Sequence, residues 1–232
     1  MRSGGQAQPV PTLDQEIEGS NPSSPANPIR AHDLTGQRKI RHVTLERRVS
    51  RLATYDPGGR ALNRTADVRI RVMERADVAA VASIEAARDG GAPDPFDARL
   101  RRQLTDQAML LLVAVIDGDI VGYGRAAFIA RPADAAADWI PEGWYLVGLV
   151  VVDAWRRAGV GRTLTAARLA WIAEWADRAY YFTNARNQVS LDLHRKLGFR
   201  ELSRAFTGPG IQFDGGHGVL EVIELAERVT IP

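Results

Sequence analysis

Hydrophobic and polar residues follow one another with a period that changes several times along the chain, and each change predicts a new element. Residues Val68–Met73 alternate apolar and polar side chains, which predicts a strand. Residues 75–91 place apolar side chains at helical spacing and end on a Gly pair, which predicts a helix. A second helix is predicted over residues 94–104, with Asp94 as its N-cap and Pro95 in its first position. The pattern thus opens with one strand and two helices.

The rest of the pattern predicts strands separated by two more helices. Residues 108–129 have the composition of a hairpin that turns at 117–119, and a polar loop over 130–143 leads to the apolar run 144–152, which predicts a buried strand. Further along the chain we expect a helix after the glycines near residue 160, a strand at 179–184, a short helix at 188–199, and two strands on either side of the Gly-rich residues 213–218. The order β-α-α-β-β-β-α-β-α-β-β predicts a mixed α/β sheet.

The first part of the chain differs in composition from the rest. Residues 1–37 are rich in Pro, Ser, Gly, Asn and Gln without an apolar period, which predicts disorder. Residues 38–51 form a basic run, for which a docking arm, an RNA-contacting patch and translated sequence upstream of the true start all stay open. We therefore expect an N-terminal extension over residues 1–64 and one folded domain over residues 65–232.

Composition excludes several classes of protein. The chain has no cysteine, and its four histidines (His32, His42, His194 and His217) lack metal-ligand spacing, so we expect no metal. No apolar stretch approaches the length of about 18 residues that a membrane helix needs, and the N-terminus does not resemble a secretory signal, which predicts a cytoplasmic protein. The net charge is only +2, and the basic residues are almost all arginine, a bias that we attribute to genome composition rather than to nucleic-acid binding.

The segment Val151–Ile172 carries the clearest chemical signal. A buried strand runs through a tight glycine turn into a helix, an arrangement that points several backbone N–H groups outward at the positive end of a helix dipole. Gly159 and Gly161 lack the Cβ atoms that would block a diphosphate, and nearby arginines can supply charge. No Gly-Lys-Ser/Thr is present, and a dinucleotide fingerprint would need glycine at Leu164. A phosphate cradle and a plain structural turn both remain open.

Together with residues 179–199, this segment resembles the acetyl-coenzyme A motif of the GNAT N-acetyltransferase superfamily. The shared features are the strand, the pattern Arg156-x-x-Gly159-x-Gly161 with its helix, and a second strand followed by Asn187 and a short helix that closes on Gly-Phe. The resemblance covers about residues 68–228. It implies a mixed, mostly antiparallel central sheet flanked by helices, and acetyl-CoA as co-substrate without a metal.

The resemblance also implies which residues bind the cofactor. Leu149, Val150 and Val151 would pair through their backbone with the pantetheine arm, and core packing is the alternative role for their side chains. Asn187 would contact the cofactor near its reactive end, and a helix cap is the alternative. The pyrophosphate would lie against Arg156, Arg157, Ala158, Gly159, Val160, Gly161, Arg162 and Thr163.

The catalytic residues are less clear, because the chain departs from the family pattern. Where the family usually has a tyrosine that protonates the leaving thiolate, this chain has His194, which could act as imidazolium or through a neutral N–H and would then also contact the cofactor. A helix-surface histidine without a proton role is the alternative. Ser190, one turn earlier, is a weaker candidate for the acid. Glu142 is the candidate general base, with a plain loop residue as its alternative.

The acceptor is predicted from the loops expected around the site. Carboxylates and indoles in these loops suit a cationic, polyhydroxylated or aromatic amine, and the residues concerned are Asp89, Asp94, Asp97, Asp134, Asp138, Glu142, Trp139 and Trp144. The resemblance extends to aminoglycoside 2'-N-acetyltransferases of the kasugamycin-modifying type, so we expect a small-molecule amine substrate. A protein or peptide N-acetyltransferase and a non-catalytic acyl-CoA-binding regulator are the alternatives. Many relatives form dimers, so a homodimer is also open.

Overall fold

The computed structural model describes residues 67–213 and 217–225. The expected disorder of residues 1–37, the basic run at residues 38–51 and the domain boundary near residue 64 lie outside the described residues. Within them, the elements follow each other in the predicted order. The fold class expected from the sequence is thereby confirmed.

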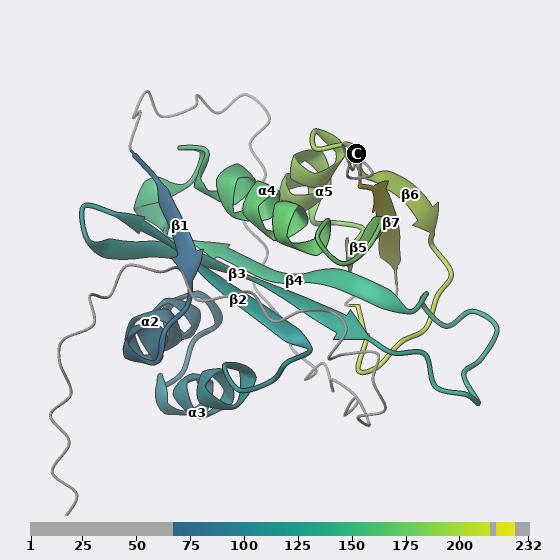
Figure 1. Cartoon of the computed structure of the whole chain (residues 1–232), viewed down its shortest axis with the longest axis horizontal. Helices are drawn as coiled ribbons and strands as arrows, with labels where there is room; N and C mark the ends of the chain where they lie inside the picture. Colours follow the sequence, from purple (N-terminus) through teal and green to yellow (C-terminus); the bar gives the residue numbers. More distant parts are fainter. Residues whose placement is uncertain (1–66, 214–216, 226–232) are drawn as a thin grey trace, which may run out of the picture.

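A single seven-stranded sheet forms the centre of the molecule, with the strand order β1-β2-β3-β4-β5-β7-β6 (Figure 1). Its strands are β1 (Arg69–Val72), β2 (Met109–Ile116), β3 (Asp119–Ile129), β4 (Gly143–Val151), β5 (Arg178–Asn184), β6 (Arg200–Ser203) and β7 (Gly218–Glu224). Neighbouring strands run antiparallel except β4 and β5, which are parallel. The sheet is therefore mixed and mostly antiparallel, as the resemblance implied.

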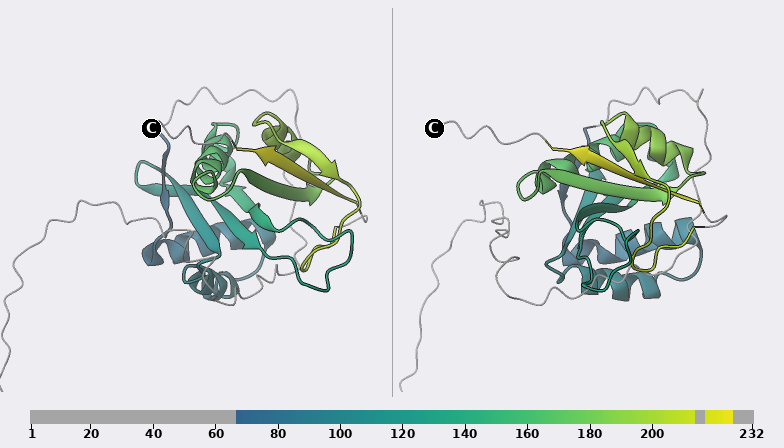
Figure 2. Two further views of the ribbon diagram at one scale, coloured as in Figure 1. Left: turned by 45° about the vertical axis from the view of Figure 1, so that its right-hand side comes forward. Right: turned by 90° about the vertical axis from the view of Figure 1, so that its right-hand side faces the viewer.

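Two pairs of helices cover opposite faces of the sheet. Figure 1 shows α2 (Val78–Asp89) and α3 (Asp94–Gln103) below it, and α4 (Val160–Ile172) and α5 (Gln188–Arg195) above it; Figure 2 shows the same layers from two further sides. Short 3-10 turns, η1 (Arg75–Asp77) and η2 (Asp153–Trp155), precede α2 and α4. Separate apolar clusters fill the two layers, because each helix pair buries one apolar face against the sheet.

The start of α3 differs from the expectation by one residue. Pro93 is the N-cap, Asp94 is the first helical residue, and Pro95 is the second. Asp94 was therefore wrongly predicted as the cap. Proline is tolerated at either of the first two positions because the first turn of a helix has no intrahelical acceptor for those N–H groups.

A β-bulge interrupts β4 at Gly148. Leu149 pairs with Gly124 of β3, but the next pair joins Val147 to Arg125, so Gly148 is the extra residue, and its φ is +66°. The bulge reverses the alternation of side chains: Val147 packs on the α2/α3 side of the sheet, whereas Leu149 packs on the α4 side with the core there. An uninterrupted strand would have turned both side chains to the same face.

The sheet divides between β4 and β5. In the described part of the chain these strands are paired only at Tyr145–Tyr180 and Leu146–Tyr181. Beyond Leu146, β4 continues for five residues along β3 while β5 pairs with β7 over its whole length. The β5-facing edge of β4 from Val147 to Val151 is therefore left without a strand partner within the described chain, and it leads directly to the turn before α4.

Candidate active site

The turn between β4 and α4 places backbone amides at the start of the helix. Gly159 is the N-cap and has the left-handed φ of 85°, and Arg157 also has a positive φ, of 64°. The first helical bond runs from the Thr163 N–H to the Gly159 carbonyl at 3.0 Å. The amides of the three preceding helical residues have no acceptor within α4, which is the general condition of a helix N-terminus. They are available to an anion.

The two glycines of this turn lie in different surroundings. A Cβ at Gly159 would meet no described atom within 4 Å, so its positive φ is what favours glycine there. A Cβ at Gly161 would lie 3.6 Å from the Leu149 side chain of β4 and 3.8 Å from those of Val151 and Leu193. These are ordinary contact distances. The packing of the chain itself therefore leaves room for alanine at Gly161.

The residues predicted to surround the pyrophosphate lie together at this turn, but Arg156 is already engaged. Its guanidinium contacts Asp153 at 2.7 Å and donates to the Val151 carbonyl at 3.3 Å, which holds the end of β4. Arg157 and Arg162 are exposed. The Thr163 hydroxyl donates to the Gly159 carbonyl at 3.2 Å.

Asn187 and Ser190 lie at the start of α5. Asn187 is the N-cap by backbone position but makes no side-chain capping bond among the described residues; its Nδ2 donates to the Thr183 hydroxyl at 3.1 Å. The Ser190 hydroxyl accepts a bond of 2.5 Å from the Tyr181 hydroxyl. Burial raises the pKa of Tyr181 to about 12, so the phenol keeps its proton and donates it.

His194 is a core residue rather than a surface residue. Its side chain is 1% exposed and stacks on Tyr181, with ring centroids 3.6 Å apart. Burial lowers the pKa of His194 to about 3, so the ring is neutral at neutral pH. Nδ1 lies 2.8 Å from the Ser190 carbonyl, which can only accept, so Nδ1 carries the proton. Nε2 is then an acceptor and has no partner among the described residues.

These contacts differ from both roles expected for His194. Burial disfavours the imidazolium form of His194. In the neutral form, the Nδ1–H group donates to the Ser190 carbonyl. The alternative of an exposed helix-surface histidine is wrong, whereas a role in proton transfer stays a prediction. The sequence showed the position of the residue in α5 but not the Tyr181 ring that covers it.

Glu142 lies in the loop before β4 and is exposed. Its carboxylate accepts a bond of 3.0 Å from the Arg131 N–H, which joins the two ends of the loop. The same loop is tied to the segment after β6: the Ile140 N–H donates to the Thr207 carbonyl, and the Thr207 N–H donates to the Asp138 carbonyl, each at 2.9 Å. Glu142 thus has a structural contact, and the two loops form one unit beside β4 and β5.

Several side chains expected to line the acceptor site are engaged elsewhere. Trp144 was predicted wrongly: it is 3% exposed and packs edge-on against Trp171 of α4, on the face opposite to the two loops. Asp89 pairs with Arg88, Asp97 with Arg101, and Asp138 accepts from the Thr207 hydroxyl. These carboxylates hold their own loops and helices.

An aromatic cluster lies on the α2/α3 side of β4 and β5. Tyr145 stacks on Tyr180 with centroids 5.1 Å apart, and Phe182, which is partly exposed, contacts Phe206 at 6.3 Å. Val147 packs with these rings and is the cross-strand partner of Arg125. The aromatic rings and the arginine therefore share one face of the sheet, next to the unpaired edge of β4.

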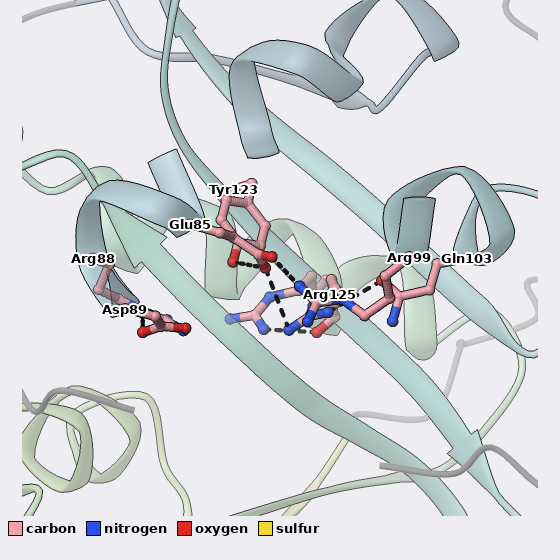
Figure 3. A network of polar contacts seen from close by, with 8 residues as sticks. Glu85, Arg88, Asp89, Arg99, Gln103, Tyr123 and Arg125 are labelled. Carbon is pink, nitrogen blue, oxygen red and sulfur yellow. Dashed lines mark hydrogen bonds and ion pairs between the residues drawn. The ribbon is translucent and has the colours of Figure 1, made fainter. Parts of the chain in front are cut away.

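A buried polar network on this face was missed by the sequence analysis (Figure 3). Glu85 of α2 is fully buried, accepts hydrogen bonds from the Tyr123 hydroxyl and from Arg99 of α3, and forms an ion pair with Arg125 at 3.8 Å. Arg125 also donates to Gln103 at 3.1 Å. One signal was present: Glu85 follows Val78 and Val81 at helical spacing, so it falls on the apolar face of its helix.

The described residues contain no group of three or more histidine, aspartate or glutamate side chains placed to bind a metal. None of the helices described in residues 67–213 and 217–225 is both long and apolar enough to cross a bilayer.

Comparison with known proteins identifies the class to which this fold and site belong. Residues 79–199, just over half of the chain, match the acetyltransferase (GNAT) family. The chain therefore belongs to the GNAT family, and it is an N-acetyltransferase.

Three similar proteins illustrate the range of this family. Aminoglycoside N(6')-acetyltransferase type 1 from Stenotrophomonas maltophilia is 29% identical over 140 residues, which are 58% of this chain and 88% of that protein. An N-alpha-acetyltransferase from Sulfurisphaera tokodaii is 27% identical over 103 residues, 43% of this chain and 61% of that protein. Among solved structures, yncA from Salmonella typhimurium, determined with its cofactor acetyl-CoA, is 21% identical, with a TM-score of 0.50 and coverage of 70% of this chain and 96% of that one.

Proposed function

We propose that the protein transfers the acetyl group of acetyl-CoA to a primary amine of a small cationic molecule, with an aminoglycoside as the leading acceptor. The single observation that carries the cofactor half of this proposal is the division of the sheet after Leu146. It leaves β4 with an open edge that ends at the amides of the α4 turn. A strand edge and a helix N-terminus together suit an amide-containing arm that ends in a diphosphate.

This arrangement fixes the orientation of the cofactor along β4. Its pyrophosphate lies at the start of α4, against residues 156–163, where Arg157 and Arg162 are exposed. Its pantetheine arm runs back along Leu149, Val150 and Val151. The thioester lies at the far end of the open edge, at Val147 and Gly148, immediately before β5 closes against β4 at Leu146. Asn187, at the start of α5, would contact the cofactor near this reactive end.

The reaction is a direct acyl transfer. The nitrogen of the neutral amine attacks the thioester carbonyl carbon, the carbonyl electrons move to oxygen, and their return breaks the C–S bond. The amine loses one proton, and the leaving thiolate of coenzyme A gains one. No enzyme nucleophile is consumed, which agrees with the absence of cysteine from the sequence.

The proposed proton groups follow from the contacts within α5 and β5. Ser190 accepts the Tyr181 bond and keeps its own hydroxyl proton for another acceptor, so we assign the contact to the leaving sulfur to Ser190. His194 holds the Ser190 carbonyl from inside the core and supports this helix turn. Glu142 remains the candidate base, acting through water from its exposed loop.

The acceptor assignment is supported by two observations. The matching aminoglycoside acetyltransferase aligns over most of its own length. The partly exposed rings Phe182 and Phe206 stand on the acceptor side of β4, where aromatic faces attract cationic amines. Kasugamycin and the 2'-amino group are the narrowest form of this proposal. An N-terminal amine of a protein or peptide is the second candidate, because an N-alpha-acetyltransferase also matches the chain.

A thiol-release assay tests the proposal. Purified protein is incubated with acetyl-CoA and, in turn, with kasugamycin, with aminoglycosides that carry 2'- or 6'-amino groups, and with peptides that have a free N-terminal amine. Thiol release with one or more aminoglycosides is the expected result. Release with peptides alone would transfer the assignment to the second candidate. Calorimetric binding of acetyl-CoA without release for any amine would indicate the non-catalytic regulator instead.

A further inference from the structure

The bulge at Gly148 has an arginine on each side of the sheet. On the α2/α3 side, a Cβ at Gly148 would lie 2.6 Å from Nη2 and 2.9 Å from Nε of Arg125. On the α4 side, a Cβ at Gly124, which pairs with the residue after the bulge, would lie 3.0 Å from Nε of Arg168. The two guanidinium groups therefore lie on opposite faces of the same short stretch of β3 and β4.

The position of Arg125 is fixed from three directions. Gln103, at the end of α3, accepts a bond of 3.1 Å from Nη1, and the carboxylate of Glu85 lies 3.8 Å from Nη2. The guanidinium carbon lies 5.8 Å from the centre of the Tyr123 ring. Figure 3 shows these side chains meeting from α2, α3 and β3. The buried Nε has no hydrogen-bond acceptor among the described residues, so the donor capacity of Arg125 is not used up by its neighbours.

Arg168 supports the bulge from the other face. It is 1% exposed, and its Nη1 donates to the Arg125 carbonyl at 2.9 Å, where the register of the ladder shifts. Its other bonds go to the Leu164 carbonyl and the Thr165 hydroxyl. No carboxylate of the described residues forms an ion pair with it. Burial lowers the pKa of Arg168 to about 9, which still leaves the side chain charged at neutral pH.

Positive charge is therefore concentrated at the bulge. Among the described residues, Glu85 is the only ion-pair partner of Arg125, and Glu85 also pairs with Arg99. Arg168 has no carboxylate partner among these residues. Burying cations with so little compensation costs stability, so an anionic charge that appears at this point during function would be strongly favoured. In direct acyl transfer, the negative charge develops on the oxygen of the thioester carbonyl.

We propose that Arg125, held by Glu85 and Gln103 and backed by Arg168, lies beside the thioester carbonyl of bound acetyl-CoA and stabilises the negative charge that develops on its oxygen. This inference rests on the proposed function, which places the thioester at Val147 and Gly148. Glu85, Gln103 and Arg168 are positioning residues in this arrangement.

The vibrational spectrum of the bound thioester tests this inference without any acceptor amine. Acetyl-CoA labelled with 13C at the carbonyl is bound to the wild type and to the variants Arg125→Gln, Arg125→Lys and Gln103→Ala, and the carbonyl stretching band is recorded. In the wild type, the band should lie at lower frequency than in free acetyl-CoA, because positive charge polarises the bond. Arg125→Gln should return it most of the way to the free value, and Arg125→Lys and Gln103→Ala should give intermediate positions.

The kinetics supply a second readout once an acceptor is known. Removal of a group that stabilises an oxyanion lowers kcat by roughly 100- to 1,000-fold. We expect Arg125→Gln to fall within this range, with less than a threefold change in the KM for acetyl-CoA and partial rescue by lysine. Arg101→Gln, at an exposed ion pair of α3, is the matched control and should change neither band nor kcat.

The outcomes separate this inference from the proposed function. If the wild type and Arg125→Gln both bind acetyl-CoA with the same carbonyl band, the role of Arg125 is refuted while the function stands. If the wild type does not bind acetyl-CoA at all, the proposed function fails and the inference fails with it. Gln103→Ala, which removes only a tether at the end of a helix, keeps the test valid should Arg125→Gln fail to fold.

Discussion

Two buried polar clusters on opposite faces of the sheet differ in charge. On the α2/α3 face, Glu85, Arg99 and Arg125 form a charged cluster that is held by ion pairs. On the α4/α5 face, Tyr181 and His194 form a neutral cluster that is held by hydrogen bonds and ring stacking. The difference lies between these two clusters and not between the whole faces, because the charged Arg168 is also buried on the α4 side.

This difference agrees with the proposed function. In that proposal, backbone amides and a strand edge bind the cofactor, whereas the charged cluster lies beside the negative charge that develops during transfer, where fixed charges stabilise it. We therefore expect the two clusters to respond differently to substitution and to pH.

The largest expected effect is on the charged cluster. In Glu85→Ala, Arg99 and Arg125 lose a shared buried carboxylate, and removal of one partner from a buried pair costs about 3–5 kcal/mol. We expect the free energy of unfolding, measured by urea denaturation, to fall by about this amount. Arg101→Ala, which breaks the exposed pair with Asp97, should leave it nearly unchanged. A similarly small effect from both variants would contradict the importance of the buried charges in this cluster.

An intermediate effect is expected in the neutral cluster when the pH is lowered. His194 has a native pKa of about 3, against about 6.5 in an unfolded chain, so between these values only the unfolded state binds the proton. The contribution of neutral His194 to the free energy of unfolding is complete above pH 6.5 and is lost as the pH falls toward 3. At pH 5 the loss should be about 2 kcal/mol, and His194→Phe should lack it.

Denaturation curves for the wild type and His194→Phe at pH 7 and pH 5 measure this difference. His217→Asn is the control, because His217 is exposed and should leave the pH dependence of the wild type intact. If His194→Phe and the wild type lose stability in parallel between the two pH values, the imidazole is not held neutral, and the cluster of Tyr181 and His194 is not neutral in the way that the structure indicates.

The smallest expected effect concerns affinity at the α4 turn. The packing of the chain leaves room for a Cβ at Gly161, and alanine favours a helix over glycine by about 1 kcal/mol, so Gly161→Ala should be as stable as the wild type or more stable. If the pantetheine and diphosphate pass close to this backbone, the methyl group obstructs them. We expect the Kd for acetyl-CoA, measured by calorimetry, to rise about tenfold, which corresponds to about 1.4 kcal/mol.

Ala166→Ser, at an exposed position of the same helix, is the control and should alter neither stability nor affinity. An unchanged Kd in Gly161→Ala would mean that the cofactor does not pass close to this part of the backbone, which would contradict the proposed path of the pantetheine arm and diphosphate.

The glycine turn before α4 was largely predictable because its residues are contiguous. Gly159 and Gly161 stand in one short segment with the strand before them and the helix after them, so composition alone indicated the turn, and the structure gives Gly159 the left-handed conformation that only glycine adopts easily. The bulge at Gly148 was hidden. All residues of the run Trp144–Val152 except Gly148 are apolar or aromatic. The run therefore has no alternation of apolar and polar residues that could show where the side chains change face.

The environments of single side chains were the least predictable. His194 was expected near the surface or at the thiolate, and Trp144 was expected at the acceptor site, yet both are buried by residues from other elements. The position of a residue in a helix or strand indicates which face its side chain occupies, but not which side chain of another element packs against it. The strands and helices themselves were placed correctly, because hydrophobic period depends on near neighbours.

The sequence by itself determined the order of the elements, the class of fold and the glycine turn before α4, since each depends on residues within one turn or one strand of each other. Only the tertiary structure brought Glu85, Arg99 and Arg125 together, and only the bulge decided which face Leu149 and Val147 occupy. A helix start is built from consecutive amides, whereas a buried ion pair needs groups from separate elements to exclude water jointly, and that condition exists only after folding.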